Sequence, residues 1–447
     1  MKPLAVVLIC LLPALAVCRE PVEPADEMDA EIIEAFLGHT DGVGHHCTPE
    51  RMAQFASQPE DITWQASRYI NMALVAYKLT GDPQYLDMFV NRTDALVQQL
   101  ETGPDGFRGW YGLPLKLFRH PDHPEREVDV MLTSFVMAGL LAEFAEIIDS
   151  DGLSADYGAK VAEYLELAAE LVEKWHARGC YRDLGATGAV YTTHPDLKPV
   201  KGDLTQPHNK HSKILRALVH MHAATGDDSY MRRAVKLGTR FKHCLTLAGD
   251  RYRWNYLDPS GAWDLHPEKP NQWKHWIGPE HRGGYYNLSV KQAVMMYQLG
   301  LVFDRTDMDR FARTQTEVCW NGSFDNPEWV NVDGNKKNEQ VYLCSWLAPF
   351  DERINRLAHG TWSQMQRHEN RGHSWQGGTV AGEYLESKYL LYPEYSSGQP
   401  CETDLVADFL ADPENAAFVE SLAFTVTPET SYTAPATPSQ MTPMPGA

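Results

Sequence analysis

Residues 273–286, WKHWIGPEHRGGYY, combine a group that binds carboxylates with groups that move protons. Arg282 can hold a carboxylate through two parallel hydrogen bonds, whereas His281, Tyr285 and Tyr286 can exchange a proton. The Gly-Gly pair within the stretch permits a tight turn and a close approach of the backbone to a ligand. Because a helical run over residues 287–301 follows, we expect this stretch to form one side of an active-site cleft.

A second polar cluster, residues 206–212 (QPHNKHS), occupies the same position relative to its own following helix. It contributes His208, Asn209, Lys210 and His211. Because both polar clusters directly precede a helix and are flanked by aromatic residues, we expect them to line one shared cleft. The alternative is two ordinary loops whose polar groups are satisfied within the protein, with Asn209 serving as a helix N-cap.

Together these residue types match the requirements of β-elimination from a uronate. The carboxylate beside the acidic proton must be neutralised, by Asn, His or Arg. A Tyr or His then removes that proton, and a Tyr returns one to the leaving oxygen. The predicted catalytic residues are Asn209, His208, His211, His281, Arg282, Tyr285 and Tyr286.

A glycosidase would instead need two opposed carboxyl groups. Candidates are present, but no two of them form a distinctive pair: Asp129, Asp203, Asp258, Asp264 and Glu280. Glu280 is the strongest of them because it lies inside the 273–286 stretch, while Asp258 before Pro259 is typical of a turn. Neither a CxxC nor an HExxH spacing occurs, so we expect no metal and no cofactor.

The net charge and the aromatic content indicate which classes of molecule the protein binds. The net charge is −20 over 447 residues, which argues against nucleic acid because phosphate binding needs a basic surface. A local cationic cleft within an acidic shell remains open. The 12 Trp and 20 Tyr favour stacking on sugar rings, so an anionic polysaccharide is the expected partner. The predicted substrate-binding residues are Trp64, Arg68, Trp110, Tyr111, Lys210, Trp254, Tyr256, Trp273 and Trp276.

The two ends of the chain differ in composition from the middle. Residues 1–16 have a basic residue, a short apolar run and an Ala-Leu-Ala end, which predicts a signal peptide and a secreted or periplasmic protein with no other membrane contact. Residues 17–60 are expected to form an acidic, Pro-rich linker and a first helix. The Thr- and Pro-rich residues 425–447 are expected to be a disordered tail.

Between the ends, apolar residues recur at helical spacing in pairs of segments. Residues 61–100 and 209–245 each contain two helices broken at Thr-Gly-Asp, with a tyrosine three residues after the aspartate. Weaker pairs cover 129–175 and 287–319. Repeated helical hairpins predict an all-α fold, an (α/α) toroid over 61–424, with short β-hairpins such as one from 251 to 263 in the rim loops.

This rhythm, with His208-Asn209 at one inner helix and a His-x-Gly-Gly-Tyr-Tyr entry at another, resembles the (α/α) toroid polysaccharide lyases. It is most similar to the toroid-only alginate and glucuronan lyases of polysaccharide lyase family 38. The resemblance implies Asn209 as neutraliser, one of the histidines as base or neutraliser, Arg282 as carboxylate holder and Tyr285 or Tyr286 as acid and base. Related lyases space their Arg and Tyr further apart, so Arg251 or Arg253 with Tyr256 is a rival pair.

The sequence therefore predicts an exported toroid lyase that cleaves alginate or glucuronan by metal-free β-elimination. Three alternatives stay open. A glycoside hydrolase would depend on Glu280 with Asp129 or Asp203, a uronyl epimerase would exchange the proton without cutting the chain, and a glycan-binding protein would show no turnover.

Overall fold

A computed structural model describes residues 19–428, apart from residues 117, 198, 336, 339, 369–374 and 392–403. The predicted signal peptide and residues 429–447 of the predicted tail lie outside the described residues. The main helices are α1 (Glu27–Gly42), α2 (Pro49–Ala56), α4 (Ser67–Thr80), α5 (Gln84–Val97), α6 (Met131–Ser150), α7 (Ser154–Ala177), α8 (His208–Thr225), α9 (Asp228–His243), α10 (Gly283–Gln298), α11 (Arg305–Arg313), α12 (Glu352–His368), α13 (Trp375–Leu385), α14 (Asp404–Ala411) and α15 (Pro413–Glu420).

Short turns of helix connect several of these elements. They are α3 (Pro59–Asp61), η1 (Val43–His46), η2 (Ile62–Ala66), η3 (Gly185–Thr187), η4 (Ala262–Asp264), η5 (Thr314–Cys319), η6 (Ser345–Phe350) and η7 (Glu386–Leu390). The strands are short and form only two- or three-stranded sheets in the part of the chain described: β1 (Glu101–Thr102), β2 (Arg108–Gly109), β3 (Tyr111–Gly112), β4 (Val128–Asp129), β5 (Tyr181–Asp183), β6 (Ala189–Tyr191), β7 (Thr246–Ala248), β8 (Arg251–Arg253), β9 (Leu265–His266), β10 (Lys269–Trp273), β11 (Trp329–Val330), β12 (Lys337–Asn338) and β13 (Thr427–Pro428).

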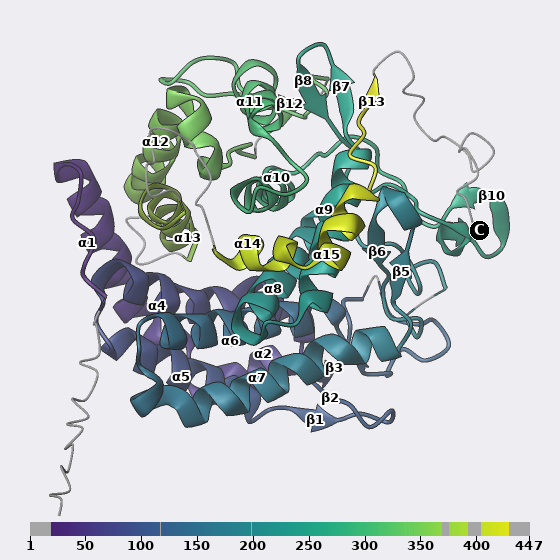
Figure 1. Ribbon diagram of the computed structural model, residues 1–447, viewed down its shortest axis with the longest axis horizontal. Helices are drawn as coiled ribbons and strands as arrows, with labels where there is room; N and C mark the ends of the chain where they lie inside the picture. Colours follow the sequence, from purple (N-terminus) through teal and green to yellow (C-terminus); the bar gives the residue numbers. More distant parts are fainter. Residues whose placement is uncertain are drawn as a thin grey trace, which may run out of the picture.

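The helices form a ring of hairpins (Figure 1). The inner members α4, α6, α8 and α10 contact one another in that order, and η6 and α13 lead from α10 back to α4. Each inner helix packs against the outer helix that follows it, as α4 does on α5, α6 on α7 and α8 on α9. This arrangement confirms the predicted all-α toroid of helical hairpins.

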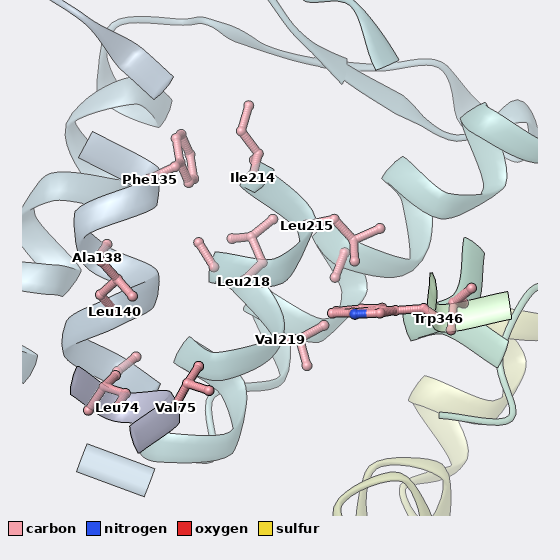
Figure 2. Close-up of a cluster of buried hydrophobic side chains, with 14 of the residues drawn as sticks. Leu74, Val75, Phe135, Ala138, Leu140, Ile214, Leu215, Leu218, Val219 and Trp346 are labelled. Carbon is pink, nitrogen blue, oxygen red and sulfur yellow. The ribbon is translucent and has the colours of Figure 1, made fainter. Parts of the chain in front are cut away.

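The core lies where the inner helices meet. Figure 2 shows Phe135 and Leu140 of α6 facing Ile214 and Leu218 of α8, with Leu74 of α4 beside them. Within the described residues, α6 is long and apolar enough to cross a membrane, but 89% of its most apolar window is buried inside the protein. Because α6 packs against α4, α7 and α8, its composition is that of a core helix enclosed on several sides.

The two Thr-Gly-Asp breaks have the same structure, as their sequences predict. Gly81 and Gly226 cap α4 and α8 in the left-handed conformation, with φ of 67° and 70°. In each turn the threonine hydroxyl donates to the carbonyl four residues earlier, Thr80 to Ala76 and Thr225 to Met221. The matching caps give both hairpins the same reversal of direction.

The N-terminal segment is more ordered than the expected linker. Helix α1 begins at Glu27, inside the acidic segment, with Asp26 as its N-cap. The fully buried Asp29 accepts hydrogen bonds from Tyr384 of α13 and Tyr389 of η7. Residues 27–61 therefore contribute three helices, and α1 packs on α4 and α13.

The rim hairpin differs in position from the prediction. Strand β8 (Arg251–Arg253) pairs with β7 before it, not with residues 262–263 after it, and β13 extends the same sheet in parallel. The turn falls at Gly249, which has φ of 63°. Two residues of the expected tail, Thr427 and Pro428, are thus held at the sheet edge.

Candidate functional site

A cavity of about 520 Å³ lies between the inner helices, a size typical of small-molecule sites. Every inner helix contributes to its wall. The polar and charged lining residues include Ser67, Arg68 and Asn71 of α4, Glu143 of α6, Ser212, Lys213 and Arg216 of α8, Asn287, Lys291 and Gln292 of α10, Glu383 of α13 and Glu386 of η7.

Helical periodicity aims the basic residues of α8 at this cavity. Lys213 and Arg216 are three residues apart and share one face of the helix. Between and beside them, Ile214, Leu215 and Leu218 turn to the core and are completely buried. A helix with charges on an inward face is stable here only because the facing helices supply partners or a cavity.

Glu143 anchors one end of the cavity. Its carboxylate lies 2.5 Å from Lys78 Nζ, 3.1 Å from Arg216 Nη2 and 3.7 Å from His220 Nε2. Burial opposes ionisation of Glu143, but Arg216 and Lys78 outweigh it and hold the pKa of the carboxyl well below its usual range. Glu143 is therefore ionised and fixes the positions of two cations.

A second ion pair crosses the cavity between α10 and α13. Lys291 Nζ lies 2.8 Å from a carboxylate oxygen of Glu383, and Asn287 donates its amide N–H to the other oxygen at 2.7 Å. Burial works against the charge of Glu383, whereas Lys291 and Asn287 lower its pKa. The amide oxygen of Asn287 is buried without a hydrogen-bond partner, so this side chain retains an acceptor at the cavity.

Lys213 differs from these paired groups. Among the residues described it has no ion pair or hydrogen bond, and its Nζ lies 5.6 Å from the ring centre of Trp64. Burial, together with the positive charges of Arg68 and Lys291, lowers the pKa of Lys213 to about 7. At neutral pH a large fraction of this amine is unprotonated and can accept a proton.

The charges around the cavity do not cancel. Arg68, Arg216, Lys291 and the protonated fraction of Lys213 line it against three carboxylates, Glu143, Glu383 and Glu386. Glu143 is also paired with Lys78 from outside the lining. This local positive excess lies inside a chain of net charge −20 and favours an anionic ligand.

The predicted rim residues form a separate cluster at the helix entries. The Tyr256 ring stacks on Tyr285 at 5.5 Å and meets His281 and His275 edge-on at 5.6 and 6.0 Å. Arg282 Nη1 lies 3.5 Å from the Tyr285 hydroxyl. Burial and the nearby Lys201 lower the pKa of His275 to about 4, so its ring is neutral. The structure thus brings together four of the predicted residues: Tyr256, His281, Arg282 and Tyr285.

The Gly-Gly pair sits between this cluster and the cavity. A Cβ at Gly283 would stand 1.9 Å from the carbonyl oxygen of Val341, so the close approach expected of this glycine is to the protein's own backbone. Gly284 has open space around its Cα and lines the cavity. Together the two glycines let α10 begin against a neighbouring segment.

None of the seven predicted catalytic residues lines the cavity, and four of them are buried at the start of α8 and α10. Asn209 is 1% exposed, His211 accepts the backbone N–H of Tyr191 at 3.0 Å, and His208 lies 3.0 Å from Asp258 Oδ2. Tyr286 is fully buried and donates to Gln315 Oε1 at 3.2 Å. None of the four lines the cavity, so direct contact with a substrate there is not available to them in this geometry.

The predicted sugar-stacking residues divide in the same way. Trp110 is fully buried and donates to the carbonyl of Leu96, and Trp254 is buried against Tyr286. Tyr111 accepts from Arg178 near β3, away from the cavity lining. Of the other predicted positions, Arg68 lines the cavity, Trp64 lies beside Lys213, Tyr256 belongs to the rim, Lys210 lies 5.8 Å from the Phe118 ring, and Trp273 and Trp276 are half-buried in and after β10.

The carboxylates considered for hydrolysis serve the fold. Glu280 is completely buried, accepts the backbone N–H groups of His281 and Arg282, and has its pKa raised to about 8 by burial. Asp129 pairs with Lys174 and Arg178. The remaining three are likewise engaged, Asp203 with Arg182, Asp258 with His208, and Asp264 with the N–H groups of Thr205 and Ser260.

Sequence reasoning missed most of the cavity residues: Glu143, Lys213, Arg216, Asn287, Lys291, Glu383 and Glu386. A signal was available in α6, where Glu143 and Glu146 are the only charged residues between Met131 and Ile148. A charge inside an otherwise apolar helix must find a buried partner or a cavity. The same reasoning applies to Lys213 beside Ile214 and Leu215.

Comparisons with known proteins add little. No family model and no curated protein matches the sequence. Among solved structures, a D-mannose isomerase matches with 13% sequence identity and a TM-score of 0.42, covering 90% of this chain and 100% of that one. A likeness at this level supports no inference about the site or its substrate.

Proposed function

We propose that the protein is a carbohydrate-active enzyme that removes the proton beside the carboxylate of a uronate sugar, with Lys213 as the base. The observation that carries this proposal is the Lys213 amine, which has no ion pair or hydrogen bond among the described residues, on the wall of a cavity that Arg68 and Lys291 also line. A general base acts best when its pKa lies near the working pH. The amine of Lys213 meets that condition.

The neighbouring groups supply what this chemistry needs. A carbon acid beside a carboxylate becomes acidic only when the charge that develops on the carboxylate is stabilised. Arg68 and Lys291 place cationic groups on the same cavity wall, and the Asn71 amide is also on the lining. These fixed charges act in a largely buried site, where they are worth more than in water.

Elimination and epimerisation share this first step. In elimination, the Lys213 amine takes the C5 proton, the electron pair forms the C4–C5 double bond, and the C4–O bond breaks. The leaving oxygen then takes this proton from the Lys213 ammonium, which restores the amine. In epimerisation a proton returns to C5 from the opposite face instead.

We favour elimination on an alginate- or glucuronan-type substrate. The sequence resemblance to toroid polysaccharide lyases supports it, as does the aromatic rim of Tyr256 and Tyr285 at the helix entries beside the cavity. In this proposal the proton-abstracting group moves from the rim histidines to Lys213. Export, which the form of residues 1–16 predicts, would place the enzyme where such polymers occur.

The test is ultraviolet absorbance during incubation with alginate blocks and glucuronan, in parallel with deuterium incorporation from heavy water. A rising signal from an unsaturated uronate in the wild type, absent in Lys213→Ala and retained in Lys236→Ala, supports elimination at the cavity. Deuterium in unbroken sugar supports epimerisation by the same base. New reducing ends without either signal contradict the proposal and favour hydrolysis.

A further inference from the structure

Three side chains that the proposed reaction does not use converge behind the rim. They are His208 at the first turn of α8, Cys244 at the end of α9 and Asp258 in the loop after β8. His208 Nε2, Cys244 Sγ and a carboxylate oxygen of Asp258 all lie within 4.8 Å of one another. We infer that these three residues form a binding site for a zinc ion.

The spacing of the three atoms suits a tetrahedral metal. Zinc binds nitrogen and oxygen at about 2.0–2.2 Å and sulfur at about 2.3 Å, so its ligand atoms stand roughly 3–4 Å apart. His208 Nε2 and Asp258 Oδ2 are already 3.0 Å apart. An ion therefore fits after adjustments of the side chains alone, with a small widening of that pair.

The donor set selects the class of metal. A thiolate, an imidazole and a carboxylate form a mixed soft and borderline set that zinc accepts and that magnesium and calcium do not. The ionised thiolate and carboxylate carry two negative charges, which balance the charge of a divalent ion. Zinc binds the thiolate form of a cysteine, so binding at Cys244 would release the thiol proton.

Surrounding groups orient the ligands. Asn255 donates its amide N–H to Asp258 Oδ1 at 2.8 Å, which leaves Oδ2 turned toward His208. Arg240 is the nearby cation, and its guanidinium donates to the Pro259 carbonyl and the Ser260 hydroxyl. Its positive charge favours the Cys244 thiolate while weakening the attraction for a metal cation.

The position of the site suggests its effect. It ties together the start of α8, the end of α9 and the loop that carries Tyr256, three segments far apart in the sequence. Cys244 and Asp258 are only half-buried, so a water molecule can reach the fourth metal position. With three protein ligands and a water molecule, a bound ion would tie these segments together without touching the cavity lining.

The experiment uses the purified full chain, first stripped with a chelator and then titrated with Zn²⁺ and, separately, with Co²⁺. We expect one zinc ion per chain by equilibrium dialysis and a higher melting temperature, since an ion that binds only the folded state stabilises it. Cobalt should give an intense near-ultraviolet band from thiolate-to-metal charge transfer. Cys244→Ser should abolish that band, and the half-buried, unrelated Cys47→Ser should keep it.

The spectrum of the wild-type protein decides the matter even if Cys244→Ser folds poorly. Cobalt binding without a charge-transfer band, or zinc binding that Cys244→Ser and Asp258→Asn leave unchanged, would overturn the inference. Failure of the stripped protein to take up one zinc ion at micromolar concentration would overturn it as well. None of these outcomes depends on the proposed catalytic activity.

Discussion

The rim cluster and the central cavity are built from the same helices, yet they use their polar residues differently. At the rim, the first turn of α8 holds His208, Asn209 and His211 in buried positions. One to two turns later, Lys213 and Arg216 face an open cavity. The comparison teaches that a rich mixture of residue types does not locate a site, because the direction around the helix decides which groups meet a ligand.

Titratable groups in the two regions also differ in their surroundings. Rim groups lie among aromatic rings and beside cations, as the neutral His275 lies beside Lys201 and Tyr256. Cavity cations are balanced by carboxylates, except Lys213. Lys213 therefore differs from the other cavity cations because it has no ion pair or hydrogen bond within the residues described.

The largest expected effect comes from removing, one at a time, the candidate proton-transfer group of the cavity and that of the rim. Lys213→Ala should lower kcat/KM by about 10³-fold, the typical contribution of a positioned general base. Tyr285→Phe at the rim should lower it by about tenfold or less. Steady-state kinetics on the substrate found by absorbance measures both, and a larger loss for Tyr285→Phe would place the proton transfer at the rim.

Removing the anchor of the cavity should chiefly affect stability. Glu143 is buried while Lys78 and Arg216 are partly exposed, so Glu143→Gln should cost about 2 kcal/mol, less than the roughly 3–5 kcal/mol of a fully buried pair. Chemical denaturation should show this fall in the free energy of unfolding. Glu163→Gln on the outer helix α7 is the matched control, because its exposed pair with Lys160 contributes little. Equal losses would contradict the assignment.

The buried rim histidine should matter for folding and not for turnover. His211→Ala leaves the backbone N–H of Tyr191 without an acceptor, which costs about 1–3 kcal/mol. The kcat of the folded fraction should stay within about threefold of the wild type. A loss of kcat of two orders of magnitude in a variant that melts normally would return His211 to the catalytic set.

The smallest effect is on pH dependence. Lys213 must be unprotonated to act, so kcat/KM should rise with pH and level off above about 7. The pKa of Lys213 is lowered on folding, so between about 7 and the unfolded value near 10.4 the unfolded state binds more protons. Stability should therefore rise with pH across that window, and this slope should be smaller in Lys213→Met.

Much of the fold could be predicted from the sequence. The repeated Thr-Gly-Asp breaks predict equivalent caps, and the structure confirms that Gly81 and Gly226 have the same left-handed conformation. Local rules suffice there because a helix end depends on its nearest residues. The strand that pairs with Arg251–Arg253 was mispredicted, because the sequence signals a hairpin without showing on which side of the strand its partner lies.

The site was harder to predict, for a physical reason. Trp110 and Trp254 resemble stacking platforms by type, and only the folded chain shows that both are buried. Conversely, Lys213 resembles an ordinary surface lysine until α4 and α10 bring Arg68 and Lys291 to the same wall. The residue types present limit the possible chemistry. Burial and neighbouring charges then determine which of several lysines or tyrosines can perform it.

The most direct measurement is the acidity of Lys213 itself, and it needs no substrate. Lysines are labelled with a trace amine-specific reagent across a range of pH, and the extent of labelling at each position is read by mass spectrometry. We predict that Lys213 reacts with a midpoint near pH 7, while Lys160, whose pKa is raised because burial is outweighed by its pairs with Glu163 and Asp94, reacts only at far higher pH. A midpoint for Lys213 near 10, equal to that of an ordinary lysine, would contradict its role as the base.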